Sequence, residues 1–378
     1  MSRSTTALVV PELNGKFELR EVYLNAIQSD EVLVEIHASG LCHTDLSCAT
    51  GVLPCEPGAV LGHEGAGVVL STGPAVTHVA AGDKVLLSFS HCESCAECSS
   101  GHPAYCHGFN ARNFGGRRAD GSPSILSAAP AGEQEEKKGM FSTFFGQSSF
   151  ARHTLVHRSS VVKVDPATDL SLFAPLGCGM QTGAGAVLNS LNVRKGSSVT
   201  VFGVGSVGMA AVMAAARISG AATVIAVDLQ ESRLELAKKL GATHGVLGSA
   251  KDVVGEIRKI CPPNGVDYAL DCTGVPAVIK SMIDCLGSRG RGATVGAPGF
   301  GKCVNVDVME HLTYGKEYVG CCEGDSLPKE FIPFLMEAHA KGQFPMEQFI
   351  EYYDFKDYEK AIADTHSGKA IKAVLRWN

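Results

Sequence analysis

A glycine-rich turn between a short apolar run and a helical pattern is the feature of this sequence that most restricts its fold. Residues 198–202 predict a strand, and a G-x-G-x-x-G run made of Gly203, Gly205 and Gly208 leads from it into a helical pattern over 209–218. Such glycines permit a tight turn, the close approach of a pyrophosphate and close packing of helix on strand. The helix N-terminus also presents free N–H groups to phosphates. The sequence therefore predicts a dinucleotide-binding unit.

The residue that ends the next predicted strand indicates which dinucleotide is bound. Residues 223–227 are apolar and end at Asp228, 20 residues after Gly208. A carboxylate at this place accepts hydrogen bonds from the adenosine ribose hydroxyls and repels a 2′-phosphate, which favours NAD over NADP. Arg233 lies nearby, and it either weakens this preference or is a solvated helix residue.

Strands and helices keep alternating after Asp228, as expected for a parallel, doubly wound sheet. We expect helices over 231–240, 251–260 and 276–286 and strands over 266–270 and 292–296. Beyond about 320, the chain shows a helix over 327–340 and a last strand near 371–376, which we expect to complete the first domain.

The first half of the chain has the short alternating runs of a β domain, and it contains a set of metal-binding residue types. Residues 5–10 and 31–37 predict strands. Cys42 follows the second of these, His63 lies between glycines in Gly-His-Glu-Gly, and Cys178 comes far downstream. Two thiols and one imidazole gathered from distant points fit a catalytic zinc, which keeps one position open. Taken singly, each residue is equally consistent with an ordinary core cysteine or histidine.

Four further cysteines form the most specific local motif. Cys92, Cys95, Cys98 and Cys106 are spaced C-x2-C-x2-C-x7-C. Four thiolates in a short lobe match a closed, tetrahedral structural zinc site, which leaves no position for chemistry. An iron–sulfur cluster and four unpaired surface thiols remain as alternatives.

Composition excludes several other classes of protein. The 378 residues carry a formal net charge of −6, so there is no basic surface for nucleic acid, and no apolar run is long enough to span a bilayer. Because no export signal precedes the β region, we expect a cytoplasmic protein whose 14 cysteines are metal ligands and reduced thiols.

Together these motifs resemble those of the zinc-dependent medium-chain alcohol dehydrogenases. The resemblance covers essentially the whole chain and is carried by Gly-Leu-Cys-His-Thr-Asp at 40–45, Gly-His-Glu-Gly at 62–65, the four-cysteine lobe, Gly-Cys-Gly at 177–179, and Gly203 to Gly208 with Asp228. It implies an α/β fold in two parts. A GroES-like, mostly β catalytic domain would comprise residues 1–179 and 322–378, and a doubly wound, parallel-sheet Rossmann domain that binds NAD would comprise 180–321.

The resemblance implies two zincs in each chain, one catalytic and one structural. Cys42, His63 and Cys178 would hold the catalytic zinc. Glu64 would lie behind the metal as an occasional ligand, and Asp45 would hydrogen-bond His63 and fix its tautomer. Asp45 is also placed to cap a helix, and both roles are compatible. The four-cysteine lobe would hold the structural zinc.

Substrate and cofactor contacts follow from the same resemblance. Thr44 would contact the alcohol oxygen and take its proton, His43 and Lys372 would meet the pyrophosphate, and Thr182 would pack near the nicotinamide. In many family members a histidine five residues after the first zinc cysteine ends the proton relay, but Ser47 stands here. Serine passes a proton but cannot hold one near neutral pH, so we expect water or another base to finish the relay.

The implied substrate is a small primary alcohol, aryl or allylic, or the corresponding aldehyde. The matching pocket residues are Leu53, Phe89, Phe144, Phe145 and Ala297, and an apolar, aromatic lining favours such substrates. Phe144 and Phe145 are expected on a strand, where they would either line the pocket or face opposite sides of the core sheet.

Three other functions fit the sequence less well. The family branch that oxidises S-(hydroxymethyl)glutathione carries an acid and an arginine where Leu53 and about Asn110 stand here. A non-catalytic zinc- and nucleotide-binding regulator would not need Thr44 and the three zinc ligands. A zinc-ribbon nucleic-acid binder conflicts with the acidic charge.

Two features are left open by the sequence. The resemblance implies a homodimer formed through edge strands near 300–320, which the residues themselves do not show. Segment 110–140 is either a lid over the pocket or plain surface, and the charged stretch within 128–138 predicts a solvated loop.

Overall fold

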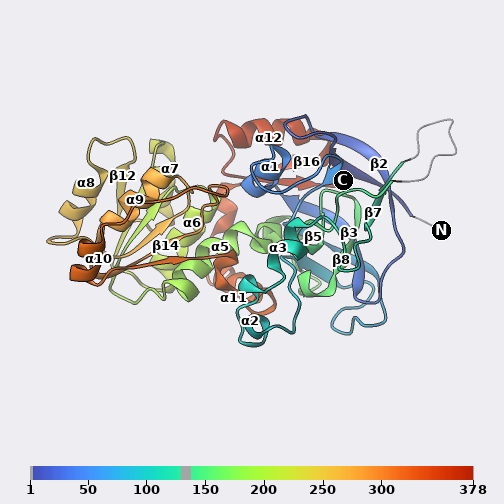
Figure 1. Cartoon of the computed structure of the whole chain (residues 1–378), viewed down its shortest axis with the longest axis horizontal. Coiled ribbons are helices and arrows are strands. Elements are labelled where there is room, and N and C mark those ends of the chain that lie inside the picture. Colours follow the sequence, from blue (N-terminus) through green and yellow to red (C-terminus); the bar gives the residue numbers. More distant parts are fainter. Residues whose placement is uncertain (1–2, 129–137, 378) are drawn as a thin grey trace. The chain divides into compact units, whose positions relative to one another are not determined.

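The chain forms two compact units, each with its own core. The structure is a computed structural model that describes residues 3–128 and 138–377 (Figure 1), so most of the predicted loop at 128–138 lies outside the described residues. Unit 1 comprises Met1–Cys178, Leu327–Pro333 and Phe349–Asn378, and unit 2 comprises Gly179–Ser326 and Phe334–Gln348.

Unit 1 is built on two sheets. In its described residues, the smaller sheet has the antiparallel order β4-β1-β2-β7, with β1 Ser4–Val10, β2 Glu18–Leu24, β4 Ala59–Val60 and β7 Ile125–Ser127. The larger sheet has the order β16-β17-β3-β5-β6-β9, and β8 also pairs with β3. Its strands are β3 Glu31–Gly40, β5 Gly65–Thr72, β6 Lys84–Leu87, β8 His153–His157, β9 Val161–Lys163, β16 Ile350–Asp354 and β17 Lys372–Arg376.

Strand β3 organises the larger sheet because it pairs with β5, β8 and β17. Its sequence alternates, and Val32, Val34 and Ile36 are fully buried in a cluster with valines from β5, β6 and β9. This is the pattern of a strand with one face on the core. The strand predicted over 31–37 is therefore confirmed, and it continues to Gly40, two residues before Cys42.

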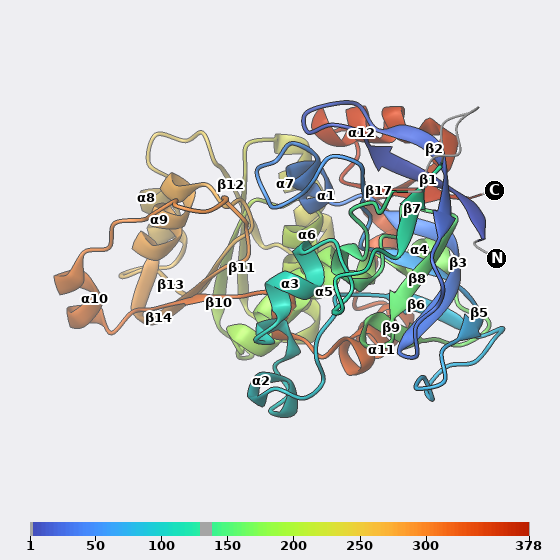
Figure 2. The same cartoon turned by 45° about the vertical axis from the view of Figure 1, so that its right-hand side comes forward.

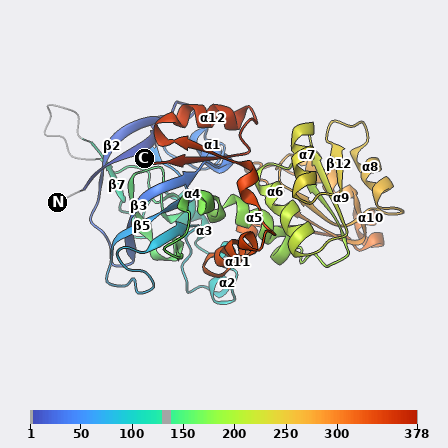
Figure 3. The ribbon, with the colours of Figure 1, turned by 180° about the vertical axis from the view of Figure 1, so that it is seen from behind.

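The helices of unit 1 are short, and two of them begin directly after a predicted metal ligand, Cys42 or Cys95. They are α1 His43–Ala49, α2 Ala96–Ser99, α3 Phe109–Phe114, α4 Leu170–Phe173 and α12 Tyr358–His366. Helix α12 lies beside the C-terminal strand β17, as the view from behind shows (Figure 3). Helix α1 begins directly after Cys42, so a strand and a helix together place this cysteine.

Unit 2 contains the predicted doubly wound sheet. Its residues are all described, and its six parallel strands have the order β12-β11-β10-β13-β14-β15. The strands are β10 Ser198–Phe202, β11 Thr223–Asp228, β12 His244–Leu247, β13 Val266–Asp271, β14 Leu286–Thr294 and β15 Glu317–Gly320, and Figure 2 shows β10, β13 and β14 side by side. Because the strand order reverses beside β10, the turn after β10 lies where such sheets bind ligands.

The connecting helices of unit 2 complete the alternation. They are α5 Gly179–Gly185, α6 Ser206–Met213, α7 Glu231–Leu240, α8 Val253–Ile260, α9 Pro276–Asp284 and α10 Val308–Tyr314, while α11 Pro328–Ala340 contributes residues to both units. A five-residue π turn continues α6 to Ile218. Within the described ranges, no helix combines the length and apolarity needed to cross a membrane.

One predicted strand is wrong. Residues around 144 form a tight 3-10 turn, Phe144–Gly146, instead of a strand. Thr143, Phe145 and Ser148 all have positive φ angles near 50–60°, which an extended strand does not allow. The predicted alternation of Phe144 and Phe145 across a sheet is therefore wrong as well.

Candidate metal centre and dinucleotide turn

Two thiols, an imidazole and a carboxylate from distant parts of unit 1 converge on one point. The ligand atoms of Cys42, His63, Glu64 and Cys178 all lie within 4.8 Å of one another. Cys42 precedes α1, His63 and Glu64 precede β5, and Cys178 follows the turn Ala174–Gly177. The structure thus brings together the three residues that the sequence singled out. Two sulfurs and one nitrogen suit a borderline-soft cation such as zinc.

Asp45 holds two of these ligands from behind. Its carboxylate accepts a hydrogen bond from Nδ1 of His63 at 2.9 Å, and it also accepts from the backbone N–H groups of Cys42 at 2.9 Å and Gly62 at 3.0 Å. Both the imidazole and the carboxylate are fully buried. A proton held on Nδ1 leaves the lone pair of Nε2 for a metal. Asp45 fills its predicted position beside His63 and caps α1 as well.

The charges at this point fit a cation. Nε2 of His63 is buried and makes no hydrogen bond among the described residues, although two thiols lie beside it. A hydrogen bond with Cys178 holds the pKa of the Cys42 thiol well below its usual value. Burial acts in the opposite direction, and the charge of His63 lowers the pKa further. Burial lowers the pKa of His63, but Asp45 and Cys42 outweigh burial and raise it well above its usual value. Such a charged donor set accepts a metal in place of protons.

Glu64 is held away from solvent by a buried ion pair. Nζ of Lys372 lies 2.5 Å from Oε2 of Glu64 and 3.2 Å from the carbonyl oxygen of Leu41, and both charged side chains are at most 1% exposed. A Cβ at Gly40 would lie 1.9 Å from the Glu64 carboxylate, so glycine there makes room for it. Burial raises the pKa of Glu64 to about 7, although Lys372 acts in the opposite direction. The amine predicted to meet a pyrophosphate therefore pairs with Glu64 in this structure.

Helix α1 presents the residues predicted to handle the proton. The hydroxyl of Thr44 lies 3.7 Å from Sγ of Cys42. Thr44 and Ser47 are three residues apart and so lie on one face of the helix. His43 is the first residue of α1, and its side chain is exposed.

Aromatic rings surround the imidazole of His63. The ring of Phe145 stacks on it with centroids 4.5 Å apart, and the ring of Phe144 meets it edge-on at 5.4 Å. The ring of Phe114 lies 5.1 Å from that of Phe145 and 5.8 Å from that of Phe144, and the ring of Phe109 lies 6.4 Å from that of Phe145. Phe144 and Phe145 are buried, whereas the two α3 rings are half-exposed. The metal site thus has an aromatic wall.

The α3 phenylalanines were missed by the sequence analysis. Phe109 and Phe114 follow the cysteine lobe, in a segment that sequence reasoning left open between lid and surface. The five-residue spacing of two aromatic side chains directly after Cys106 was the available signal. Phe89, a predicted pocket residue, is buried and lies 5.9 Å from Phe109, so it extends the same cluster.

The four-cysteine lobe has the geometry of a single-ion site. Sγ of Cys98 lies 3.8 Å from Sγ of Cys92 and 3.5 Å from Sγ of Cys95, and all four sulfurs lie within 4.8 Å of one another. A tetrahedron with Zn–S bonds of about 2.3 Å places its sulfurs roughly 3.8 Å apart. An iron–sulfur cluster needs wider spacing, because its cysteines bind different irons. Backbone hydrogen bonds from Ser94 and Cys95 lower the pKa of Cys92 to about 5, which favours a thiolate.

In unit 2 the three glycines of the predicted turn differ in what a side chain would meet. Gly203 has φ +81°, which favours glycine, and a Cβ on Gly208 would lie 2.0 Å from the carbonyl oxygen of Gly203. A Cβ on Gly205 would meet no atom within 4 Å, so this position is open to a ligand. Gly205 also caps α6. The turn therefore offers a cradle for a pyrophosphate at a helix N-terminus.

The predicted ribose-binding acid ends β11. The carboxylate of Asp228 accepts hydrogen bonds from the backbone N–H groups of Val204 at 2.9 Å and Gln230 at 3.0 Å. The guanidinium of Arg233 lies 3.8 Å from the same carboxylate. Asp228 is thus fixed beside the glycine turn, and Arg233 is placed to pair with this acid.

The remaining predicted residues are distributed between the units. Thr182 lies in α5 of unit 2 and is largely buried. Ala297 is exposed just after β14, also in unit 2, whereas Leu53 is half-buried after α1 in unit 1. Their contacts with substrate or cofactor remain predictions.

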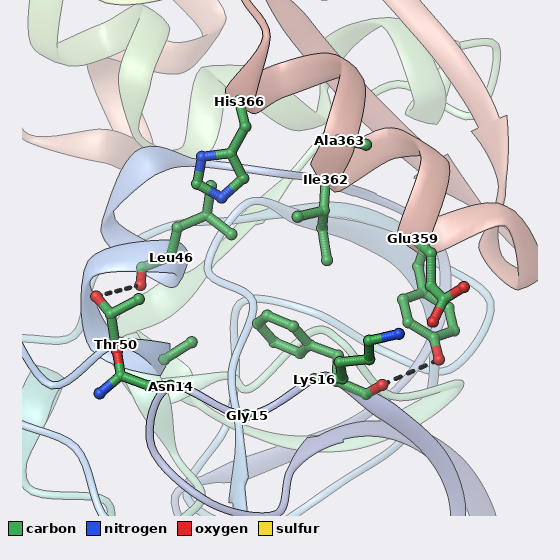
Figure 4. A pocket seen from close by; sticks show the side chains of 12 residues that line it. Asn14, Gly15, Lys16, Leu46, Thr50, Glu359, Ile362, Ala363 and His366 are labelled. Carbon is green, nitrogen blue, oxygen red and sulfur yellow. Dashed lines mark hydrogen bonds between the residues drawn. The ribbon is translucent and has the colours of Figure 1, made fainter.

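A separate hollow of about 510 Å³ lies in unit 1 between α1, residues 14–17 and α12 (Figure 4). Leu46 and Ile362 point into it from the two helices. Two other lining residues are joined by a hydrogen bond from the hydroxyl of Tyr358 to the carbonyl oxygen of Phe17. No predicted metal, substrate or cofactor residue lines the hollow, so its position argues against a role as the alcohol site.

Comparisons with known proteins agree with this geometry. Residues 28–166 match the alcohol dehydrogenase GroES-like domain, and residues 206–340 match the zinc-binding dehydrogenase domain. The chain is 38% identical to geraniol dehydrogenase of Castellaniella defragrans, over 98% of this chain and 97% of that protein.

Two solved structures share the whole architecture. An alcohol dehydrogenase zinc-binding domain protein from Burkholderia ambifaria is 47% identical with a TM-score of 0.95, and benzyl alcohol dehydrogenase from Acinetobacter calcoaceticus is 40% identical with a TM-score of 0.93. Each match covers 100% of both chains. The site, the fold and the near-complete match to these relatives lead to one conclusion: this chain belongs to the zinc-dependent medium-chain alcohol dehydrogenases and is a zinc-containing alcohol dehydrogenase.

Proposed function

We propose that this enzyme couples NAD to the oxidation of an aryl or allylic primary alcohol, or to the reverse reduction of the aldehyde. The observation that carries the proposal is the stacking of Phe145 on the metal-binding ring of His63, within the aromatic wall continued by Phe114. An alcohol oxygen directed at a metal beside this wall brings its carbon chain against aromatic rings. Flat, unsaturated groups pack well on such surfaces.

The residues of unit 1 have separate tasks in this reaction. Zinc, when bound, acts as a Lewis acid and lowers the pKa of an alcohol hydroxyl. Cys42, His63 and Cys178 would hold it, and Asp45 keeps the proton of His63 on Nδ1. The hydroxyl of Thr44, 3.7 Å from Sγ of Cys42, would take the proton of the alcohol.

The features that support NAD as the cofactor lie in unit 2. NAD, when bound, accepts the hydride from the alcohol carbon. The open Gly205 position and the N-terminus of α6 suit its pyrophosphate, and the carboxylate of Asp228 suits its ribose hydroxyls. The 2′-phosphate of NADP would meet that carboxylate unfavourably, although Arg233 lies 3.8 Å from it.

The substrate class is also supported by the relatives, which are named for geraniol, an allylic alcohol, and for benzyl alcohol, an aryl alcohol. Leu53 and Asn110 lack the charges that would grip a glutathione adduct. The test is a panel of benzyl alcohol, geraniol, ethanol and S-(hydroxymethyl)glutathione with NAD and with NADP, followed by NADH or NADPH absorbance. We expect kcat/KM to be highest for the first two with NAD. A preference for ethanol or for the glutathione adduct would refute the proposed substrate class.

We also propose a second, structural zinc in the four-cysteine lobe. Its support is the 3.5–3.8 Å spacing of the sulfurs of Cys92, Cys95 and Cys98, which suits one tetrahedral ion. Elemental analysis of the purified enzyme should give two zincs and no iron in each chain. A count of one zinc, lost together with activity on mild chelation, would mean that the lobe is empty.

We further propose a homodimer formed through the edge of the unit 2 sheet. Strand β15 ends that sheet, and α10 beside it exposes Val308, Met309 and Leu312 at 66–74% of their surface. A strand at the end of a sheet, flanked by exposed apolar side chains, is a pairing surface. Sedimentation analysis should show a dimer that Leu312→Asp weakens, whereas Val275→Asp, which also alters an exposed apolar residue, should leave it intact.

A further inference from the structure

A strained turn lies against the chain segment that carries His63. Thr143, Phe145 and Ser148 have φ angles of 60°, 52° and 50°, a region that side chains with a Cβ rarely adopt. Such strain persists only where the surroundings over-determine the backbone, and it gathers at functional sites. Here the hydroxyl of Ser148 donates to the carbonyl oxygen of Val60 at 2.6 Å, and the N–H of Ser149 donates to the carbonyl oxygen of Gly62 at 2.9 Å.

The side chain of Gln147, at the centre of this turn, is fully buried, and its hydrogen bonds within the described residues all go to backbone groups. Its amide nitrogen donates to the carbonyl oxygens of His63 at 2.9 Å and Ser88 at 3.0 Å. Its amide oxygen accepts from the N–H of Gly65 at 3.0 Å. One amide therefore ties together the two backbone segments on either side of Glu64 and the end of β6.

Ser88 in turn bonds the segment that carries the third metal ligand, Cys178. The hydroxyl of Ser88 donates to the carbonyl oxygen of Gly177 at 2.7 Å, and Gly177 directly precedes Cys178. A Cβ on Gly177 would lie 2.1 Å from the carbonyl oxygen of Leu87, so this segment is pressed against β6. Gln147 and Ser88 thus connect the backbone of His63 to the backbone beside Cys178, as Asp45 connects Cys42 to His63.

We propose that Gln147 is a positioning residue of the metal centre, which acts through Ser88 to set the separation of His63 from Cys178. Its amide matches this task because it offers two donors and one acceptor to three fixed backbone groups. This inference rests on the proposed zinc chemistry of the same site, but it concerns how tightly and in what geometry the metal is held. Partners behind metal ligands commonly change metal affinity or activity 10- to 100-fold when they are removed.

The test compares Gln147→Met with Asn113→Leu. Both changes keep the side-chain size and remove a fully buried amide with three backbone bonds, but Asn113 bonds Ser90 and Phe109 instead of the segments that carry His63 and Cys178. The readouts are the rate at which the site with two cysteines and one histidine releases its zinc to a chelator, and the visible spectrum of the same site when it holds cobalt. We expect Gln147→Met to speed zinc release about 10- to 100-fold and to shift the cobalt bands, whereas Asn113→Leu leaves the bands unchanged.

Two further variants keep the test decisive if Gln147→Met does not fold. Gln147→Glu retains an acceptor for Gly65 but brings a carboxylate against two carbonyl oxygens, and Ser88→Ala removes the hydrogen bond to the carbonyl oxygen of Gly177. Both should shift the cobalt bands in the same direction as Gln147→Met, with smaller changes in zinc release.

Parental cobalt bands and parental zinc release in the Gln147 and Ser88 variants would overturn the proposal. So would an equal acceleration of zinc release in Asn113→Leu, because the effect would then be general loss of stability. These measurements use no substrate, so an enzyme that failed to oxidise alcohols would count against the proposed function and not against the role of Gln147.

Discussion

The carboxylate of Asp45 and Nδ1 of His63 lie 2.9 Å apart, and neither side chain is exposed to solvent. In Asp45→Asn, a single oxygen would have to accept from all three N–H donors. The new NH2 group would face one of these donors and could not accept its hydrogen bond. We expect zinc affinity to fall about 10- to 100-fold and kcat to fall with it. Competition with a chromophoric chelator measures the affinity. An unchanged affinity would show that the ring is held by its aromatic neighbours instead.

Asp228 should set the choice of nicotinamide cofactor. Replacing it with serine removes a charged acceptor, and losing a hydrogen bond to a charged group costs about 1.5–3 kcal/mol. We therefore expect kcat/KM for NAD to fall roughly 10- to 100-fold in Asp228→Ser, with a smaller loss or a gain for NADP because Arg233 is freed. Steady-state kinetics with both cofactors test this. Glu231→Gln, an exposed acid in the first turn of α7, is the matched control and should leave the NAD/NADP ratio unchanged.

The parts of this molecule that sequence reasoning predicted are those encoded by short-range patterns. The strand, glycine turn, helix and acid over 198–228 follow local spacing, and the structure confirms the parallel doubly wound sheet that they implied. The family resemblance is confirmed by two matching domain models and near-complete relatives. Cys42, His63 and Cys178 were predicted to meet because of their residue types. Two thiols and one imidazole are a common ligand set of catalytic zinc.

The parts that sequence reasoning missed depend on tertiary contacts. Apolar Phe144 and Phe145 favoured a strand, but bonds made by Gln147 and Ser148 to residues more than 50 positions away hold the backbone in a left-handed turn. The ion pair of Lys372 with Glu64 was not predicted either, because it depends on β17 pairing with β3; the contact of Lys372 with the pyrophosphate stays a prediction. No local pattern encodes either arrangement. The polar run Gln-Ser-Ser between phenylalanines was the only hint.

The aromatic wall should discriminate between alcohols. Phe114→Leu removes a half-exposed ring that packs on Phe144 and Phe145. Aromatic packing contributes about 0.5–1.5 kcal/mol, so KM for benzyl alcohol should rise roughly 2- to 12-fold while KM for ethanol stays the same. Ile362→Ala in the separate hollow is the matched control, and we expect it to change neither constant (Figure 4). A KM for benzyl alcohol that responds to Ile362 would place the alcohol in that hollow.

Ser47 should limit how the proton leaves the site. Adding an imidazole with a pKa near 6.5 gives the relay a group that holds a proton. In Ser47→His, alcohol oxidation should therefore rise through about pH 6.5 and level off, where the parent enzyme keeps rising with pH. The measurement is kcat from about pH 5.5 to 9.5. Thr50→His, which adds the same group one turn further along the chain, should behave like the parent. Superimposable profiles for Ser47→His and the parent would rule out a relay through this position.

His153 should make the folded state sensitive to acid. Burial and the nearby Arg3 lower its pKa to about 4, and Nε2 lies 2.8 Å from the Arg3 guanidinium, so the ring must stay neutral to accept that hydrogen bond. An unfolded histidine titrates near 6.5, so between about pH 6.5 and 4 the unfolded chain binds a proton that the folded chain does not. The stabilising contribution is complete above pH 6.5 and is lost as the pH falls toward 4.

Because the ring is half-exposed, we expect His153→Gln to lose about 1 kcal/mol less stability than the parent between pH 7 and 5. Urea unfolding at both pH values measures this difference, and effects of acid on the metal sites cancel between variant and parent. His78→Gln, which alters an exposed ring, should follow the parent at both pH values; equal losses in His153→Gln and the parent would mean that His153 is protonated in the folded enzyme.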